Sequence, residues 1–320
     1  MATRKGAGRA GTGREVTRSR KLTWAAGIFL LIAAVSLVAF WMHPLRFYQA
    51  AAELQLKFAG AESRSITVAG MRVHYYVLGP SGGQAVVLVH GLGGRSQDWR
   101  SLAPYLAKAG YRVFLPDLPG YGQSDRPIDF SYSVPAEAET AVGFMDALAL
   151  KQVDLGGWSM GGWIVQRIAY AHPERVRRLL LFDSAGINEM PTWDTRLFTP
   201  SNAAEVDQLE SLLMPHPPRI PGFVAKDILR SSRRNGWIIH RAVASMLYGH
   251  DTTDDVLPQL KMPVLIVWGS EDRITPLSQG EKMHRLVPQS QLDVIEGCGH
   301  LAPVQCATEI GPKVVGFLRE

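Results

Sequence analysis

The hydrophobic pattern of the chain changes near residue 60, from one long apolar run to short apolar segments separated by amphipathic stretches. Consecutive apolar positions, typical of strands covered on both faces, occur at 85–89, 112–115, 153–155, 176–182, 264–268 and 292–295. Helical patterns lie at 99–109, 135–148, 160–171, 277–286 and 308–318. This alternation predicts an α/β fold with a mostly parallel central sheet flanked by helices, entered through a hairpin at 65–68 and 73–78.

The alternation is interrupted once, between residues 187 and 257. This stretch is rich in proline and carries two helical patterns, at 203–213 and 236–248. An insertion of this length is too long for a plain loop, so we expect a mostly helical cap over one edge of the sheet. The core of the fold is then predicted to consist of residues 65–186 and 258–320.

Residues 22–42 form an apolar run without a charged side chain, about 30 Å long as a helix. Trp24 and Trp41 lie near its two ends, where indole rings settle at a membrane–water boundary. With the basic tail of residues 1–21, this run predicts a single transmembrane helix, a cytoplasmic N-terminus and an extracytoplasmic globular domain. The alternative is a cleaved secretory signal, whose apolar region is shorter, roughly 7 to 15 residues.

Charge is concentrated in the N-terminal tail. The formal net charge is +5, and the first 21 residues alone hold seven basic residues against the single acid Glu15. The rest of the chain is close to neutral, which argues against nucleic acid as a partner, and the membrane is expected to be bound through residues 22–42. Residues 43–64 mix apolar and charged side chains, so we expect a juxtamembrane helix partly on the lipid surface, with a solvated stalk as the alternative.

The chain has two cysteines, Cys298 and Cys306. Two cysteines at this spacing make neither a disulfide framework nor a zinc site, and no metal or other cofactor is expected. We interpret both as small buried apolar residues. A single bridge between them is the alternative, because the domain is predicted to face an oxidising compartment.

Ser159 follows a predicted strand and directly precedes a predicted helix, in the pattern Gly157-Trp158-Ser159-Met160-Gly161. This turn is so sharp that side chains at 157 and 161 would collide with the neighbouring strand and helix, whereas glycine fits. The turn also holds the serine hydroxyl clear of the backbone. The pattern therefore predicts a nucleophilic serine.

A serine hydroxyl is a weak nucleophile, so it needs a base and an acid that orients the base. His300 ends a predicted strand in a glycine-flanked loop and is the candidate base. For the acid, Asp272 is favoured because it follows another strand end, and its neighbour Glu271 is expected to point elsewhere. Asp183, which directly follows the predicted strand at 176–182, is the alternative acid.

Acyl transfer also needs donors for the developing oxyanion. His90-Gly91-Leu92 follows the 85–89 strand, so the backbone N–H of Leu92 can join that of Met160. We interpret His90 as bracing this loop rather than acting as a base. The stretch 117–124 is interpreted as a tight scaffold loop.

These motifs together resemble the α/β-hydrolase family over nearly all of residues 65–320: His90-Gly91, Asp117 with Gly120, Gly122 and Ser124, Gly157-Trp158-Ser159-Met160-Gly161, Gly269 with Asp272, and Gly299-His300. With the apolar N-terminal run, the whole chain looks like membrane-anchored monoacylglycerol lipases. The globular part is also similar to meta-cleavage C–C bond hydrolases and cofactor-free haloperoxidases. Haloalkane dehalogenases and epoxide hydrolases differ, because their nucleophile is an aspartate.

The resemblance implies a triad of Ser159, Asp272 and His300, and an oxyanion hole at the backbone of Leu92 and Met160. It further implies hydrolysis of a carboxylic ester, monoacylglycerol or a related lipid ester, through an acyl-enzyme without a cofactor. Two alternatives remain open at this point. One is a C–C bond hydrolase on the same scaffold, and the other is a non-catalytic membrane interaction protein that has kept the fold.

Overall fold

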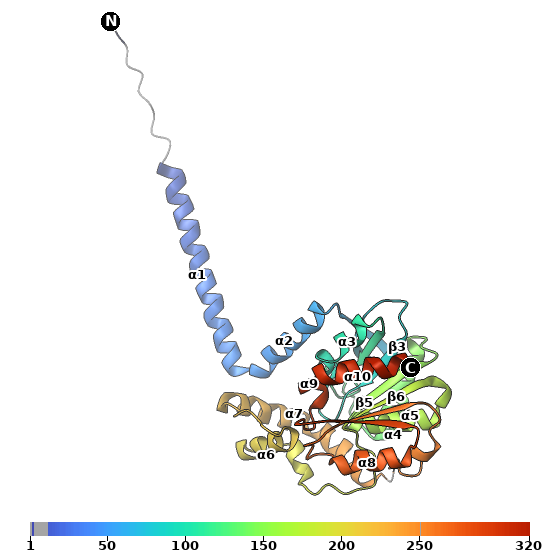
Figure 1. The fold of residues 1–320 in the computed structure, drawn as a ribbon. Coiled ribbons are helices and arrows are strands. Elements are labelled where there is room, and N and C mark those ends of the chain that lie inside the picture. The colour runs from blue at the N-terminus through green and yellow to red at the C-terminus, as the bar shows by residue number, and fades with distance from the viewer. Residues whose placement is uncertain (1, 3–11, 250) are drawn as a thin grey trace.

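The central element of the computed structural model, which describes residues 2, 12–249 and 251–320, is an eight-stranded sheet (Figure 1). Its strand order is β1-β2-β4-β3-β5-β6-β7-β8. The strands are β1 (Glu62–Val68), β2 (Met71–Leu78), β3 (Ala85–Val89), β4 (Arg112–Pro116), β5 (Val153–Trp158), β6 (Val176–Phe182), β7 (Val264–Gly269) and β8 (Ser290–Ile295). All pairs from β4 to β8 are parallel, whereas β1 and β2 are antiparallel to their neighbours. The predicted mostly parallel sheet is confirmed.

The sheet is covered on both faces by helices. Buried side chains of α4 (Val134–Ala147), α5 (Met160–Ala171) and α8 (Leu277–Leu286) belong to one apolar cluster. Those of α3 (Ala103–Lys108), α9 (Ala302–Gln305) and α10 (Ala307–Arg319) belong to the other. Short 3₁₀ turns complete the connections at Ser96–Arg100, Pro173–Arg175 and Leu257–Gln259. Because helices cover both faces of the sheet, most of its strands appear in the sequence as runs of consecutive apolar residues.

The segment between β6 and β7 is helical and lies beside the ends of the strands (Figure 1). It contains a 3₁₀ turn (Thr195–Phe198), α6 (Ala203–Leu213) and the long helix α7 (Gly222–Tyr248). The pattern predicted α6 at its observed bounds but only the second half of α7. Charged and polar residues at 230–235 weaken the apolar signal in the first half of α7, which packs against α2 and α6 rather than the core.

The N-terminal part consists of α1 (Thr12–Met42) and α2 (Pro44–Phe58), and α1 extends away from the rest of the protein (Figure 1). The apolar side chains described in α1, from Trp24 to Met42, are largely exposed. Among the described residues no single helix is by itself long and apolar enough to cross a bilayer. Ala26–Met42 and Pro44–Phe58 reach the required length and apolar character only when they are taken together, and the two helices meet at an angle of 105°. The transmembrane helix therefore stays a prediction, and the basic tail at 1–21 lies largely outside the described residues and side chains.

Helix α2 is packed on the domain rather than extended as a stalk. Leu56 is fully buried in the cluster that contains α3 and α10. At the other end of α2, the backbone N–H of Leu45 donates to Oδ2 of Asp227 on α7, at 3.1 Å. Arg230 of α7 donates to the carbonyl of Met42, at 2.9 Å. The junction of α1 and α2 is thereby bound to the cap.

Two local expectations need correction. The hairpin strands begin earlier than predicted, at Glu62 and Met71, because cross-strand pairing continues beyond the apolar residues into the exposed end of β1.

Cys298 and Cys306 form a disulfide, with their Cα atoms 6.6 Å apart. The expectation of two unpaired buried cysteines was therefore wrong. The fold places the loop before His300 against the end of α9, which the sequence spacing alone did not reveal.

A buried carboxylate connects the loops beneath the cap. Asp117, at the end of β4, accepts hydrogen bonds from Nδ1 of His74 at 2.8 Å, the backbone N–H of Ser96 at 2.7 Å and that of Gln123 at 2.9 Å. Burial raises the pKa of Asp117, but the His74 bond and the backbone donors outweigh burial and bring it to about 2. A Cβ on Gly122 would lie 2.1 Å from this carboxylate, so the loop needs glycine there.

Asp117→Asn is expected to lower the free energy of unfolding near neutral pH by about 2–3 kcal/mol, since the native pKa lies about two units below that of the unfolded chain. A depressed carboxylate pKa stabilises above its unfolded value, and the contribution is lost as pH falls from about 4 toward 2. Thermal unfolding of both proteins in detergent from pH 7 downward measures this. The difference in Tm should shrink as pH falls below 4; a constant difference would contradict the charged network.

Candidate active site

Ser159 stands in the turn between β5 and α5, with φ +56° and ψ −121°. Its backbone is fixed from both sides, because its N–H donates to the carbonyl of Phe182 at 3.0 Å and its carbonyl accepts from the N–H of Ala185 at 3.0 Å. A Cβ on Gly157 would lie 2.2 Å from the carbonyl oxygen of Gly161, and a Cβ on Gly161 equally close to that of Val89. Glycine is thus a steric requirement of this turn, as the sequence predicted.

The structure brings the hydroxyl of Ser159 together with His300 and Asp272. Nε2 of His300 lies 2.9 Å from Oγ of Ser159, and Nδ1 of His300 lies 2.7 Å from Oδ2 of Asp272. All three residues are buried, and His300 is only 3% exposed. In this arrangement the imidazole can donate to Asp272 through Nδ1–H and accept the serine proton at Nε2. Glu271, by contrast, is exposed.

The carboxylate of Asp272 is held by its own loop. Its Oδ1 accepts from the backbone N–H groups of Ile274 and Thr275, at 2.8 and 3.0 Å, and its Oδ2 accepts from the hydroxyl of Thr275 at 2.7 Å. The indole N–H of Trp158 donates to the carbonyl of His300, at 2.8 Å. Sequence reasoning missed Thr275 and Trp158 as supporting residues. Their positions next to Asp272 and Ser159 in the sequence were the available signal.

Asp183 lies beside Asp272 but does not contact His300. Its Oδ1 accepts from the backbone N–H of Gly269, at 2.7 Å, while its Oδ2 has no hydrogen-bond partner among the described residues. Complete burial, and secondarily the negative charge of Asp272, raise the pKa of Asp183 well above its ordinary value. Because Asp183 favours its neutral form and does not contact His300, Asp272 is the carboxylate placed to stabilise a charged imidazole.

The backbone N–H groups of Leu92 and Met160, the expected oxyanion donors, belong to segments next to Ser159. Met160 is the first residue of α5, so its N–H has no partner within the helix. No described residue accepts a hydrogen bond from the N–H of Leu92. Gly91 keeps this loop close to the nucleophile, because a Cβ there would lie 3.1 Å from that of Ser159.

His90 is buried behind the oxyanion loop. Its Nε2 accepts from the backbone N–H of Leu118 at 3.1 Å, so Nδ1 carries the proton that it donates to the carbonyl of Gly91 at 2.8 Å. Burial lowers the pKa of His90, which keeps the ring neutral. The ring connects two loops and makes no contact with Ser159, an arrangement that matches the bracing role inferred from the sequence.

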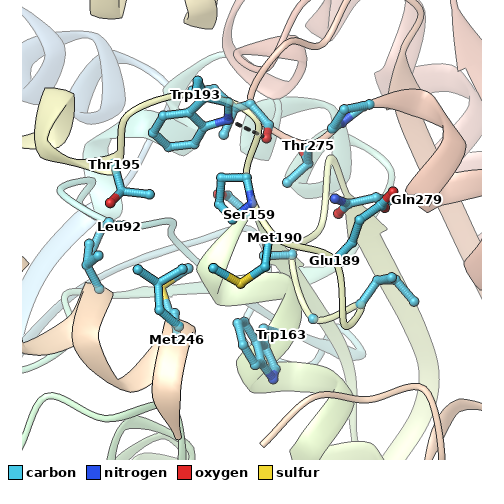
Figure 2. A pocket seen from close by; sticks show the side chains of 18 of the residues that line it. Leu92, Ser159, Trp163, Glu189, Met190, Trp193, Thr195, Met246, Thr275 and Gln279 are labelled. Atoms are coloured by element: carbon cyan, nitrogen blue, oxygen red, sulfur yellow. Dashed lines mark hydrogen bonds between the residues drawn. The ribbon is translucent and has the colours of Figure 1, made fainter. Parts of the chain in front are cut away.

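Two cavities meet at Ser159. The first, of about 220 Å³, lies between the sheet and the cap and has a largely apolar wall, made by Trp163, Met190, Trp193, Phe198, Met246, Leu247 and Ile274. Figure 2 shows Trp193 and Trp163 at opposite ends of this wall, with the indole of Trp193 donating to the carbonyl of Ile274 at 3.1 Å. The second cavity, of about 390 Å³, passes His300 and reaches Leu45 and Tyr48 on α2.

The α/β-hydrolase fold family matches residues 84–227 and 243–305. The chain belongs to this family. The structure of a bacterial membrane phospholipase A is similar, with a TM-score of 0.79 and 26% identity over 93% of this chain and 98% of that one. In sequence, the 2-hydroxymuconate semialdehyde hydrolase of Pseudomonas sp. (strain CF600) is 32% identical over 80% of this chain and 94% of that protein. Lipase 1 of Psychrobacter immobilis is 27% identical over 80% of this chain and 84% of that protein.

Membership of the α/β-hydrolase family establishes this chain as a hydrolase. Membership does not identify the bond that is cleaved, because the relatives include a protein named as a lipase and one named as a 2-hydroxymuconate semialdehyde hydrolase. The substrate therefore has to be inferred from the cavities and the N-terminal helices.

Asp272→Asn is expected to lower kcat for a water-soluble p-nitrophenyl ester by about 10⁴-fold, because the amide favours the wrong imidazole tautomer. Asp183→Asn, a nearly isosteric change at a carboxyl whose pKa is raised and that does not contact His300, is the matched control and should retain most activity. Steady-state kinetics of both variants at neutral pH make the comparison. If Asp183→Asn were the more damaging change, the acid would have to be reassigned to Asp183.

Proposed function

We propose that this α/β-hydrolase is a membrane-anchored serine hydrolase that cleaves carboxylic esters of lipids, monoacylglycerols or related compounds. The observation that carries the proposal is the position of Ser159 between two cavities. One has an apolar wall suited to an acyl chain, and the other leads to α2, beside the exposed apolar surface of α1. A lipid ester needs both an apolar site for the acyl group and access from a membrane.

The chemistry follows from the geometry at Ser159. His300 takes the proton of Oγ as the oxygen attacks the ester carbonyl, and the backbone N–H groups of Leu92 and Met160 stabilise the oxyanion. Collapse of this intermediate transfers the proton from His300 to the departing alcohol and leaves an acyl-Ser159 ester. Water then gives up a proton to His300 and attacks the acyl carbonyl, which releases the fatty acid and restores the hydroxyl.

Three observations support anchoring through residues 22–42. From Trp24 to Val38, the large apolar side chains described in α1 are more than half exposed, whereas Phe40 and Trp41 pack against Phe223 of α7. The similarity to the membrane phospholipase A covers 93% of the chain, more than Pro44 to Glu320 alone, so it extends into α1. The Cys298–Cys306 disulfide suits a domain outside the cytoplasm, with the basic tail on the cytoplasmic side.

A second candidate is hydrolysis of a C–C bond in a ring-cleavage product. It is favoured by the 32% identity to the 2-hydroxymuconate semialdehyde hydrolase, which exceeds the 27% identity to Lipase 1. The same triad can serve this reaction. Exposed apolar residues on α1 and α2 have no role in it, since such a substrate dissolves in water.

Replacing Ser159 by Ala is expected to lower kcat for monoacylglycerols by about 10⁴- to 10⁶-fold and to abolish labelling by a fluorophosphonate, since the nucleophile is removed. Full-length protein in detergent is assayed with monoacylglycerols of graded acyl length and, in parallel, with 2-hydroxymuconate semialdehyde. The wild-type protein should have the higher kcat/KM for a monoacylglycerol. Faster turnover of the semialdehyde would decide for the C–C candidate, and labelling of Ser159→Ala would exclude Ser159 as nucleophile.

Deletion of residues 1–42 is expected to leave kcat/KM for a short water-soluble ester nearly unchanged, because the triad lies wholly beyond Gly157. Hydrolysis of a long-chain monoacylglycerol in vesicles should fall by roughly 10²-fold, since anchoring raises the local concentration of enzyme at the lipid surface. The measurement is the ratio of the two rates in full-length and truncated protein. An equal ratio in both would show that the anchor does not deliver the enzyme to its substrate.

A further inference from the structure

The second cavity at Ser159 differs from the first in its charge. Three arginines line it, Arg95, Arg100 and Arg126, against the single acid Asp98. The glycine-rich segment 91–94 also lines this cavity, and Arg100 lies over the ring of Tyr48. Burial raises the pKa of Asp98, although the N–H and the charge of Arg95 act in the opposite direction.

Asp98 acts electrostatically on Arg95 and Arg100, and Asp117 acts on Arg126, but no carboxylate forms a direct ion pair with any of the three in the described part of the chain. Among the described residues, none of the ion pairs involves Arg95, Arg100 or Arg126. Arg126 donates to backbone carbonyls, those of Gly122 at 2.8 Å and Ser124 at 3.4 Å. Arg100 donates to the carbonyl of Gln97 at 3.3 Å and to the hydroxyl of Tyr48 at 2.6 Å.

The arginines also repel one another. Partial burial, and then the charges of Arg95 and of Arg234 on α7, lower the pKa of Arg126. Three arginines in one cavity against the single acid Asp98 leave an excess of positive charge, which destabilises the folded chain, and such violations are expected where a site serves a ligand. Because guanidinium groups bind phosphate through two parallel hydrogen bonds, an anion with several oxygens is the ligand that this cluster fits.

The position of the three arginines indicates which part of the substrate they would contact. The acyl chain is accounted for by the apolar cavity on the other side of Ser159. The second cavity would then hold the alcohol portion of the ester. This portion would leave past His300 toward α2. We infer that Arg95 and Arg126, assisted by Arg100, form a subsite for a phosphate group on the alcohol portion of a lipid ester. The inference rests on the proposed lipid-ester activity and adds the class of leaving group.

The test compares two esters that differ only in phosphate, a monoacylglycerol and the corresponding 1-acylglycerol 3-phosphate. Both are assayed with full-length protein at low mole fraction in micelles of an uncharged detergent, at fixed ionic strength, so that surface charge stays constant. The wild-type protein should show the higher kcat/KM for the phosphate ester. Arg95→Gln and Arg126→Gln should each reduce the ratio of phosphate to neutral ester about tenfold, mainly through KM.

Two further variants control for charge and folding. Arg233→Gln removes an equal charge from an exposed position of α7 outside the cavity and should leave the ratio unchanged. Arg126→Lys keeps the charge but loses the paired hydrogen bonds, so it should retain part of the preference. Fluorophosphonate labelling of every variant reports whether the triad is intact. An equal loss in Arg233→Gln would overturn the subsite and attribute the preference to general electrostatic attraction.

The remaining outcomes separate the inference from the proposed function. If the wild-type protein hydrolyses both esters equally well, the subsite is wrong and lipid-ester hydrolysis stands. Hydrolysis of neither ester would overturn both. Inorganic phosphate is added in a parallel assay of the neutral ester. Inhibition that depends on Arg95 and Arg126, without any preference for the phosphate ester, would assign the site to a free anion and overturn the headgroup role.

Discussion

Ser159 has to hold a left-handed backbone conformation at the point where β5 becomes α5, and the rest of the site is arranged around this constraint. The turn is possible only because Gly157 and Gly161 let strand and helix approach to within a distance that any Cβ would block. Glycine at 91 extends the same close packing to the oxyanion loop. The strain is supported by hydrogen bonds from Ser159 to β6 and to the loop that follows it, so the whole sheet positions one hydroxyl.

The loops that complete the site are anchored by buried polar groups rather than by packing alone. Asp117 binds donors from three separate segments, and His90 joins the oxyanion loop to the loop after β4. Asp183 and Asp272 divide their roles through electrostatics, because two buried carboxyls this close cannot both be ionised at low cost. Asp272 thus contacts His300, while Asp183 supports the turn at Gly269.

Helix α7 of the cap contacts both the apolar cavity at Ser159 and the N-terminal helices. Helix α7 contributes Met246 and Leu247 to the apolar cavity near one end, and near its other end Asp227 and Arg230 bind the junction of α1 and α2. The second cavity reaches Leu45 and Tyr48 of α2 from the same nucleophile. In the function proposed above, a lipid ester lies across both cavities, with its acyl chain under the cap and its alcohol portion toward α2.

The sequence by itself determined where the core strands lie along the chain, because strands covered on both faces consist mostly of consecutive apolar residues. It also determined the steric need for glycine around Ser159, and it placed Ser159 and His300 each after a strand end. Only the tertiary structure decided that Asp272 rather than Asp183 contacts His300, and that Cys298 bonds Cys306. The packing of α2 and the arginines gathered in one cavity were likewise visible only there. Those features depend on distances between groups remote along the chain, and no local pattern encodes such distances.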